Sequence, residues 1–290
     1  MLKRILTVFI VLFLLTGAAL AETQVYDRRS GEEPSVFDEN AELMEIIFPH
    51  IHGCNGAVIR QGDTVIVIDS CTYGQYHELK AVLDKLGVTK IDLCINTHPD
   101  NDHISGFLNI VSQYEVGAFL TGFDKKDYRE ELQNYMYRRA QDNGVEWRRM
   151  TNGETLTFGD LTLRFVQREG KNWEINNCSL QVLVSYKGRT AYFPGDIQMA
   201  CQKELAKADN PDDISAELIN WPHHGYKQMQ EPFLEKVNAL MYVITSGAST
   251  AKDSTKQLKD KGLKDRGFIT EKGALRFATD GSAWQIEYFK

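Results

Sequence analysis

Short apolar runs bounded by turn residues predict strands in the part of the chain that follows residue 40. The runs cover residues 43–49, 57–60, 64–68, 91–96 and 116–120. Apolar residues at helical spacing between the third and fourth runs predict a helix, and Gly87 is a natural stop for it. These residues are Tyr76, Leu79, Leu83 and Leu86. The folded part therefore starts with strands and then alternates strands with helices.

Residues 124–143 form a long, highly charged stretch that is compatible with a helix. Its apolar stripe is expected to consist of Tyr128, Leu132, Tyr135 and Met136. Two interpretations stay open for this segment. It is either a solvated helix that packs by this stripe, or a lid that selects substrates beside an active site.

The second half of the chain is again rich in strand patterns, at residues 161–166, 180–186, 190–193 and 216–220. A helix is expected at residues 198–207. Asp280-Gly281 between two apolar runs indicates a β-hairpin close to the C-terminus. The periodicity establishes a mixed α and β protein without clear internal repeats.

The N-terminus has the pattern of a signal peptide. Lys3 and Arg4 precede an apolar run at residues 5–15, and Ala19-Leu20-Ala21 fits the small-x-small cleavage rule. We expect export and cleavage after Ala21, to a secreted or cell-envelope location. The alternative is an uncleaved membrane anchor, for which the run is short. No second membrane-spanning pattern follows.

The remaining sequence suits a polar lead-in at residues 22–40 and one domain at residues 41–290. The formal net charge of the chain is −7, and cleavage would make it −9 because Lys3 and Arg4 would be removed. An acidic surface disfavours broad binding of nucleic-acid phosphates, which depends on Lys and Arg, although a local basic rim stays possible. The oligomeric state does not follow from the sequence.

Five cysteines leave at least one thiol without an intramolecular partner. Cys94 lies in an apolar strand pattern and is expected to be a small core residue. Cys54, Cys71 and Cys178 each lie beside a polar motif, and the spacing leaves open whether two of them pair or one lies near a metal. Cys201 is the fifth.

The densest chemistry lies in the loop Thr97-His98-Pro99-Asp100-Asn101-Asp102-His103-Ile104-Ser105-Gly106. Asp, Asn and Pro are also ordinary turn residues. Two imidazoles and two carboxylates within six residues, in a loop between a strand and a helix, instead predict a metal site, because zinc takes His nitrogen and Asp oxygen.

The pattern His-x-Asp-x-Asp-His followed by Gly resembles the metal-binding loop of the metallo-β-lactamase superfamily, whose common form is His-x-His-x-Asp-His. Asp100 departs from the common form in the way that is typical of the hydrolase domain of ComEC-type DNA-uptake proteins. The resemblance implies an α/β fold, a four-layer αββα sandwich of two mixed sheets flanked by helices. It also implies further motifs downstream.

Those motifs occur in the expected order. Asp69 ends a strand and matches the family's buried Asp that holds the metal loop in shape. Asn177 and Ser179 stand where most members have a ligating His, and we expect them to contact the substrate. Asp196 matches the carboxylate that bridges two metals.

His223-His224-Gly225 resembles the last motif of the same branch. Adjacent side chains on an extended backbone diverge, so we expect one of the two imidazoles to bind metal. His224 is assigned as the ligand and His223 as an acid or donor that faces the substrate, and the opposite assignment stays open.

The resemblance thus implies two metal sites that share Asp196. One site has all of its expected ligands, and the other site lacks a third imidazole. The predicted ligands are His98, Asp100, Asp102, His103, Asp196 and His224. One or two divalent ions are expected, zinc first and manganese as the alternative, since the second site is rich in oxygen.

These features predict an exported metal-dependent hydrolase, with Asp102 orienting the attacking water. A phosphodiester is the favoured substrate, either a small envelope compound or, less favoured by charge, a nucleic acid. A lactone or lactam hydrolase on the same fold is one alternative. A non-catalytic exported binding domain is the other.

Overall fold

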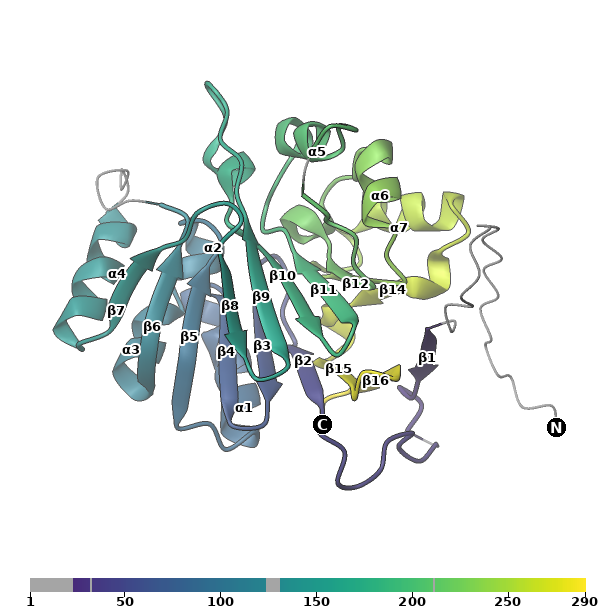
Figure 1. The fold of residues 1–290 in the computed structure, drawn as a ribbon, viewed down its shortest axis with the longest axis horizontal. Helices are drawn as coiled ribbons and strands as arrows, with labels where there is room; N and C mark the ends of the chain where they lie inside the picture. The colour runs from purple at the N-terminus through teal and green to yellow at the C-terminus, as the bar shows by residue number, and fades with distance from the viewer. Residues whose placement is uncertain (1–22, 32, 124–130, 211) are drawn as a thin grey trace.

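The computed structural model describes residues 23–31, 33–123, 131–210 and 212–290. Two β-sheets pack face to face, and helices cover the outer face of each (Figure 1). The expected αββα sandwich is confirmed. The predicted signal peptide lies outside the described residues. Every described helix is too short or too polar to cross a membrane.

The first sheet has nine strands in the order β1-β16-β15-β2-β3-β4-β5-β6-β7. They are β1 Gln24–Asp27, β2 Met44–Phe48, β3 Gly56–Gln61, β4 Thr64–Ser70, β5 Lys90–Asn96, β6 Glu115–Thr121, β7 Glu146–Arg149, β15 Leu275–Thr279 and β16 Ala283–Tyr288. β2 to β4 pair antiparallel through short turns, whereas β4 to β7 pair parallel through helical crossovers. The predicted C-terminal hairpin forms and returns to this N-terminal sheet.

The second sheet has seven strands in the order β14-β13-β12-β11-β10-β9-β8. They are β8 Thr155–Phe158, β9 Leu161–Val166, β10 Gln181–Tyr186, β11 Arg189–Phe193, β12 Leu218–Asn220, β13 Met241–Ile244 and β14 Gly267–Ile269. Strands β8 to β11 pair antiparallel, whereas strands β11 to β14 pair parallel. Both sheets thus contain a parallel half, and these halves supply the loops of the site described below.

Three separate apolar clusters follow from the alternation of side chains along the strands. In β2, Ile46 and Phe48 face the core between the sheets, whereas Ile47 faces the outer helices. The outer helices of the first sheet are α1 Tyr76–Lys85, α3 Phe107–Gln113 and α4 Glu131–Asp142. Those of the second sheet are α5 Met199–Leu205, α6 Glu231–Val237 and α7 Lys252–Asp260.

The predicted stripe of the charged segment is only partly right. Met136 is fully buried, but Tyr135 is 54% exposed, and Gln133 and Ala140 complete the buried face of α4. The buried face is centred on Gln133, Met136 and Ala140, which are three and four residues apart, and a step of 100° per residue turns Tyr135 away from its centre. For residues 131–142 the structure favours the interpretation as a packed helix, because α4 contacts α3 and β7. Tyr128 and the rest of 124–130 lie outside the described residues.

The polar lead-in also contains a strand that its composition does not suggest. β1 pairs parallel with β16 along four residues and forms the edge of the first sheet. Backbone hydrogen bonds, which are independent of side-chain polarity, account for its position.

Phe277 tests the packing between the sheets, because its ring is fully buried with ring centroids 5.9 Å from Phe48 and 5.5 Å from Phe268. Phe277→Ala should lower the free energy of unfolding by about 3–5 kcal/mol through the cavity it leaves. Tyr135→Ala, on the exposed face of α4, is the matched control and should change it by less than about 0.5 kcal/mol. Urea unfolding measures both, and equal losses would contradict the proposed core.

Candidate metal centre

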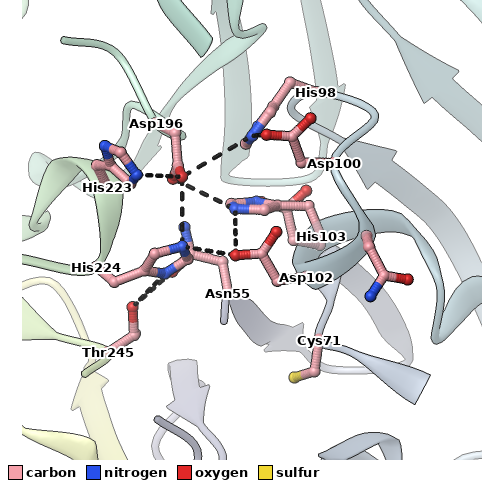
Figure 2. Close-up of polar contacts among 12 residues, drawn as sticks. Asn55, Cys71, His98, Asp100, Asp102, His103, Asp196, His223, His224 and Thr245 are labelled. Atoms are coloured by element: carbon pink, nitrogen blue, oxygen red, sulfur yellow. Dashed lines mark hydrogen bonds and ion pairs between the residues drawn. The ribbon is translucent and has the colours of Figure 1, made fainter. Parts of the chain in front are cut away.

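The polar loops of both sheets converge at the carboxyl ends of the parallel strands, between the two layers (Figures 1 and 2). Asp69 lies near the end of β4, and the His98 loop follows β5. Asp196 follows β11, and the His223-His224 pair follows β12. Parallel strands bring their carboxyl ends to one edge, which explains why motifs 150 or so residues apart meet.

Four side chains form a closed cluster of possible ligand atoms. One nitrogen or oxygen atom from each of Asp102, His103, Asp196 and His224 lies within 4.8 Å of the others. His224 Nε2 lies 3.1 Å from Asp102 Oδ2 and 3.3 Å from Asp196 Oδ2. His103 Nε2 lies 3.3 Å from Asp196 Oδ1. The set of two imidazoles and two carboxylates suits zinc and other divalent ions.

Several of the possible ligand atoms around Asp196 take no part in the hydrogen bonds of the fold. Nε2 of His98, His103 and His224, together with Asp196 Oδ1, are buried and have no hydrogen-bond partner among the described residues. A buried polar atom without a partner costs stability, and four that face one another need a common explanation. Cations bound on the two sides of Asp196 would satisfy these atoms, so the residues fit one or two metal ions.

The far side of each imidazole is held by a hydrogen bond that fixes its orientation. His103 Nδ1 donates to Asp69 Oδ2 at 2.8 Å. His98 Nδ1 donates to Thr97 Oγ1 at 3.1 Å, and this hydroxyl in turn donates to Asp69 Oδ2. Since both rings carry their proton on Nδ1, Nε2 keeps its lone pair for a metal.

His224 is oriented through a longer chain. Its Nδ1 donates to Thr245 Oγ1 at 3.3 Å, and Thr245 donates to Asn55 Oδ1 at 2.7 Å. The backbone N–H of Asn55 donates to the carbonyl of Asp102 at 3.1 Å. Asn55 therefore connects two of the loops that carry the cluster.

Asp69 holds the metal loop through both oxygens of its carboxylate. Oδ1 accepts from the Thr97 N–H at 2.9 Å and from Asn96 Nδ2 at 3.3 Å, while Oδ2 accepts from Thr97 and His103. Gly106 is also required, because a Cβ there would lie 1.9 Å from the carbonyl oxygen of Ser70. The loop is thus fixed against the end of β4.

A second set of side chains lies on the other side of Asp196 and is more open. His98 Nε2 lies 3.5 Å from Asp100 Oδ2 and 3.9 Å from Asp196 Oδ2. His223 Nε2 approaches the same Asp196 oxygen at 3.8 Å (Figure 2). The sequence predicted His98, Asp100 and Asp196 for this set, and the structure adds a second imidazole, His223, at its edge.

The backbone explains why both histidines point toward Asp196. His223 has φ 53 and ψ 49, and His224 has φ 56 and ψ 6, so both lie in the left-handed region. The extended backbone assumed from the sequence is wrong at these positions. His224 is fully buried, whereas the His223 side chain is 29% exposed. His224 therefore belongs to the closed cluster and His223 to its outer edge.

Asn177 and Ser179 support the Asp196 loop. Asn177 Oδ1 accepts from the backbone N–H groups of Gln198 and Cys201, at 3.0 and 3.1 Å. Ser179 Oγ donates to the carbonyl of Asn176 and accepts from the Asp196 N–H at 3.2 Å. These contacts use the oxygens that were expected to face a substrate, and the substrate-binding role stays a prediction.

Sequence patterns did not identify several residues of the site, since each is a common type outside the ligand motifs. Asn55, Thr97 and Thr245 orient imidazoles as described. Gln198 Nε2 donates to His223 Nδ1 at 3.2 Å. The Tyr226 ring lies 5.4 Å from that of His223 and 5.2 Å from that of His224, at the half-exposed edge.

The charges within the cluster are strongly coupled. Burial alone would raise the pKa of Asp102, but His224 and His103 hold it at about 2. Burial would likewise raise the pKa of Asp196, and the same two imidazoles hold it well below its usual range. Burial would lower the pKa of His224, yet Asp196 and Asp102 raise it to about 9. In the metal-free protein, protons on the imidazoles compensate the negative charge of the two carboxylates.

Comparisons with known proteins agree with the fold. The family model described as metallo-beta-lactamase superfamily matches residues 51–230. The chain is similar to ComE operon protein 3 of Bacillus subtilis (strain 168), with 23% identity over 163 residues, which are 56% of this chain and 20% of that protein. The chain thus spans about a fifth of the length of this relative.

Two solved structures share the fold. Zn(2+)-bound PqqB from Methylobacterium extorquens has a TM-score of 0.52 and 9% identity, over 78% of this chain and 97% of the other. A new diphosphatase from the PhnP family has a TM-score of 0.51 and 13% identity, over 81% and 98%.

The Asp69–His103 contact yields a prediction on metal affinity. Asp69→Asn keeps the shape of the side chain but removes the charge that orients the imidazole, so zinc or manganese should bind about 10–100 times more weakly. Asp63→Asn, an exposed turn residue, makes the same change of charge away from the site. Calorimetric titration of both variants measures the effect, and equal affinities would exclude this role for Asp69.

The raised pKa of His224 predicts how the metal-free protein responds to pH. A group whose pKa is higher in the folded state stabilises the fold below its unfolded value, near 6.5, and loses that contribution as pH rises through 9. The free energy of unfolding should fall by on the order of 3 kcal/mol across this window. Urea unfolding at pH 6.5 and 9 measures it. His224→Gln should reduce the decline, and an unchanged decline would rule out this origin.

Proposed function

This chain belongs to the metallo-beta-lactamase superfamily, and we propose that it is a metal-dependent hydrolase of phosphodiesters. The observation that carries the proposal is the closed cluster of Asp102, His103, Asp196 and His224 with its buried, unpaired ligand atoms. Proteins of this superfamily are generally hydrolases or related enzymes that bind one or two divalent metals. Zinc is the proposed ion, and manganese is the alternative.

The residues divide into ligands and groups that face the substrate. When bound, a divalent ion lowers the pKa of water toward neutrality and so supplies a nucleophile. His103, His224 and Asp196 are buried and would hold the ion. Asp102, whose side chain is 32% exposed, would hold it with one oxygen and orient the attacking water with the other.

His223 is proposed as the acid that donates to the leaving oxygen. Gln198 donates to its Nδ1, which leaves the proton of a neutral ring on Nε2, the atom that faces Asp196 and the opening. Burial lowers the pKa of His223, so the ring is neutral near pH 7. A hydrogen bond from Nε2–H to a phosphoryl or leaving oxygen would favour the charge that develops during hydrolysis.

Several features support a phosphodiester over other bonds. Side chains on both sides of Asp196 could hold two cations, and paired cations suit in-line displacement at phosphorus. Asn177 stands where most of the superfamily has a ligating His, so the centre departs from the lactamase type. A diphosphatase has the same fold, which is compatible with the proposal.

The cellular setting is also a proposal. The signal-peptide pattern of residues 1–21 supports export, and the net charge of −7 favours a small envelope phosphodiester over a nucleic acid. Hydrolysis of lactones or lactams is the second candidate. A non-catalytic binding domain is the third.

Hydrolysis of bis(p-nitrophenyl) phosphate tests the proposed reaction. The chain from Glu22, loaded with Zn²⁺ or Mn²⁺, should release p-nitrophenol, and Asp102→Asn should lower kcat by about 10²–10⁴-fold. Asp63→Asn should retain the full rate. Absence of turnover with both metals would reject the phosphodiesterase proposal. Turnover of a lactone or lactam by the same preparation would then favour the second candidate.

The two adjacent histidines should separate binding from catalysis. His224→Gln should lose both metal and turnover, because His224 completes the closed cluster. His223→Gln should keep the ion of that cluster but lower kcat, because the variant loses the Nε2–H donor that faces the substrate. Metal content by elemental analysis, measured beside the rate, distinguishes the roles. Equal metal loss in both variants would reject the assignment.

A further inference from the structure

Two cysteines lie directly beneath the metal centre on neighbouring segments. Cys54 lies in the loop between β2 and β3, and Cys71 follows the last residue of β4. Both side chains are fully buried. The backbone N–H of Cys71 donates to the carbonyl of Asn55 at 2.7 Å, so the two segments are in contact at this point.

The local backbone places the thiol of Cys71 over the start of β3, close to Cys54 in sequence. Cys71 has φ 64, which is unusual for a residue with a side chain, and its Sγ points back over β3. A Cβ on Gly56 would lie 2.6 Å from that sulfur, so the glycine makes room for it. The two thiols also affect each other's pKa: Cys71 lowers the pKa of Cys54, whereas burial and then Cys54 raise the pKa of Cys71.

Each cysteine is close in sequence to a residue that orients an imidazole. Cys54 precedes Asn55, which holds Thr245 and through it His224. Cys71 follows Asp69 by two residues, and Asp69 holds His103. A bond between the two sulfurs would therefore tie together the supports of both histidines.

We propose that Cys54 and Cys71 form a reversible disulfide that locks the supporting loops of the metal centre. The oxidant is a low-molecular-weight disulfide such as glutathione disulfide. The two protein thiols lose two protons and two electrons as the Cys54–Cys71 bond forms, and glutathione disulfide is reduced to two glutathione thiols. The bond requires little movement of the backbone, since the Cys71 N–H already donates to the carbonyl of Asn55, the neighbour of Cys54.

The other cysteines provide internal controls. Cys94 lies in β5 among apolar side chains of the outer core. Cys178 and Cys201 lie by the second sheet, around Asn177 and α5. They are separated from the Cys54–Cys71 pair by the site itself, so a linkage between the groups would require unfolding.

Mass spectrometry tests the pairing directly. The mature chain is incubated with glutathione disulfide, alkylated and digested with trypsin without reduction. Cleavage after Arg60 and Lys80 places the two cysteines on peptides 30–60 and 61–80. The expected product is these two peptides joined, about 2 Da lighter than their sum. Free alkylated thiols at both positions, or a different pairing, would overturn the proposal.

A second readout tests the effect on the centre. The oxidised protein should melt about 5 °C higher and should release Zn²⁺ to a chelator several-fold more slowly than the reduced protein. Cys54→Ser should abolish both differences, and Cys178→Ser should retain them. Joined peptides without slower metal release would overturn the locking role. The mass-spectrometric result stands or falls independently of any hydrolase activity.

Discussion

The structure depends on one electrostatic constraint, the burial of Asp196 among imidazoles, three of which have a buried Nε2 atom without a hydrogen-bond partner among the described residues. Its carboxylate is almost fully buried, and Nε2 atoms of four histidines approach it at 3.3–3.9 Å. Uncompensated, such a group would cost several kcal/mol. Protons on His103 and His224 can compensate it, and a divalent cation can do so while also satisfying the unpaired nitrogen atoms. The loops around it are arranged to keep that centre in place.

The fold supports this arrangement at the cost of backbone strain. Four of the non-glycine residues with positive φ are Asp69, Cys71, His223 and His224, all at or directly beneath the centre. Such conformations persist only where surrounding contacts enforce them, and they tend to gather at functional sites. Asn55 and Asp69 provide many of these contacts, because each joins two loops by hydrogen bonds. Cys54 is adjacent to Asn55 and Cys71 is two residues from Asp69, so a disulfide between them offers a covalent way to fix both residues.

Much of the fold and part of the site could be predicted from the sequence. Strand runs such as 64–68 and the hairpin at Asp280-Gly281 have strong local patterns, so β4 and the β15–β16 hairpin appear where they were expected. The loop from His98 to His103 concentrates its ligand types within six residues, and for that reason it was found. β1 was missed because its place depends on pairing with β16 and not on its own polar side chains.

The outer contacts of the site could not be predicted for a related reason. Asn55 and Thr245 are common residue types 190 positions apart, and only the finished fold brings them together. His223 points inward because its backbone is left-handed, and no local sequence pattern predicts that conformation. The oxygens of Asn177 and Ser179 bond to backbone groups of the Asp196 loop, although their positions in the motif order suggested substrate contact.

The most direct test of the account is anomalous X-ray diffraction from crystals of the chain from Glu22 grown with zinc. The account predicts a peak at about 2.0–2.3 Å from ligand atoms of Asp102, His103, Asp196 and His224. A zinc ion bound elsewhere, with the nitrogen atoms of His103 and His224 engaged by protein or water alone, would contradict it.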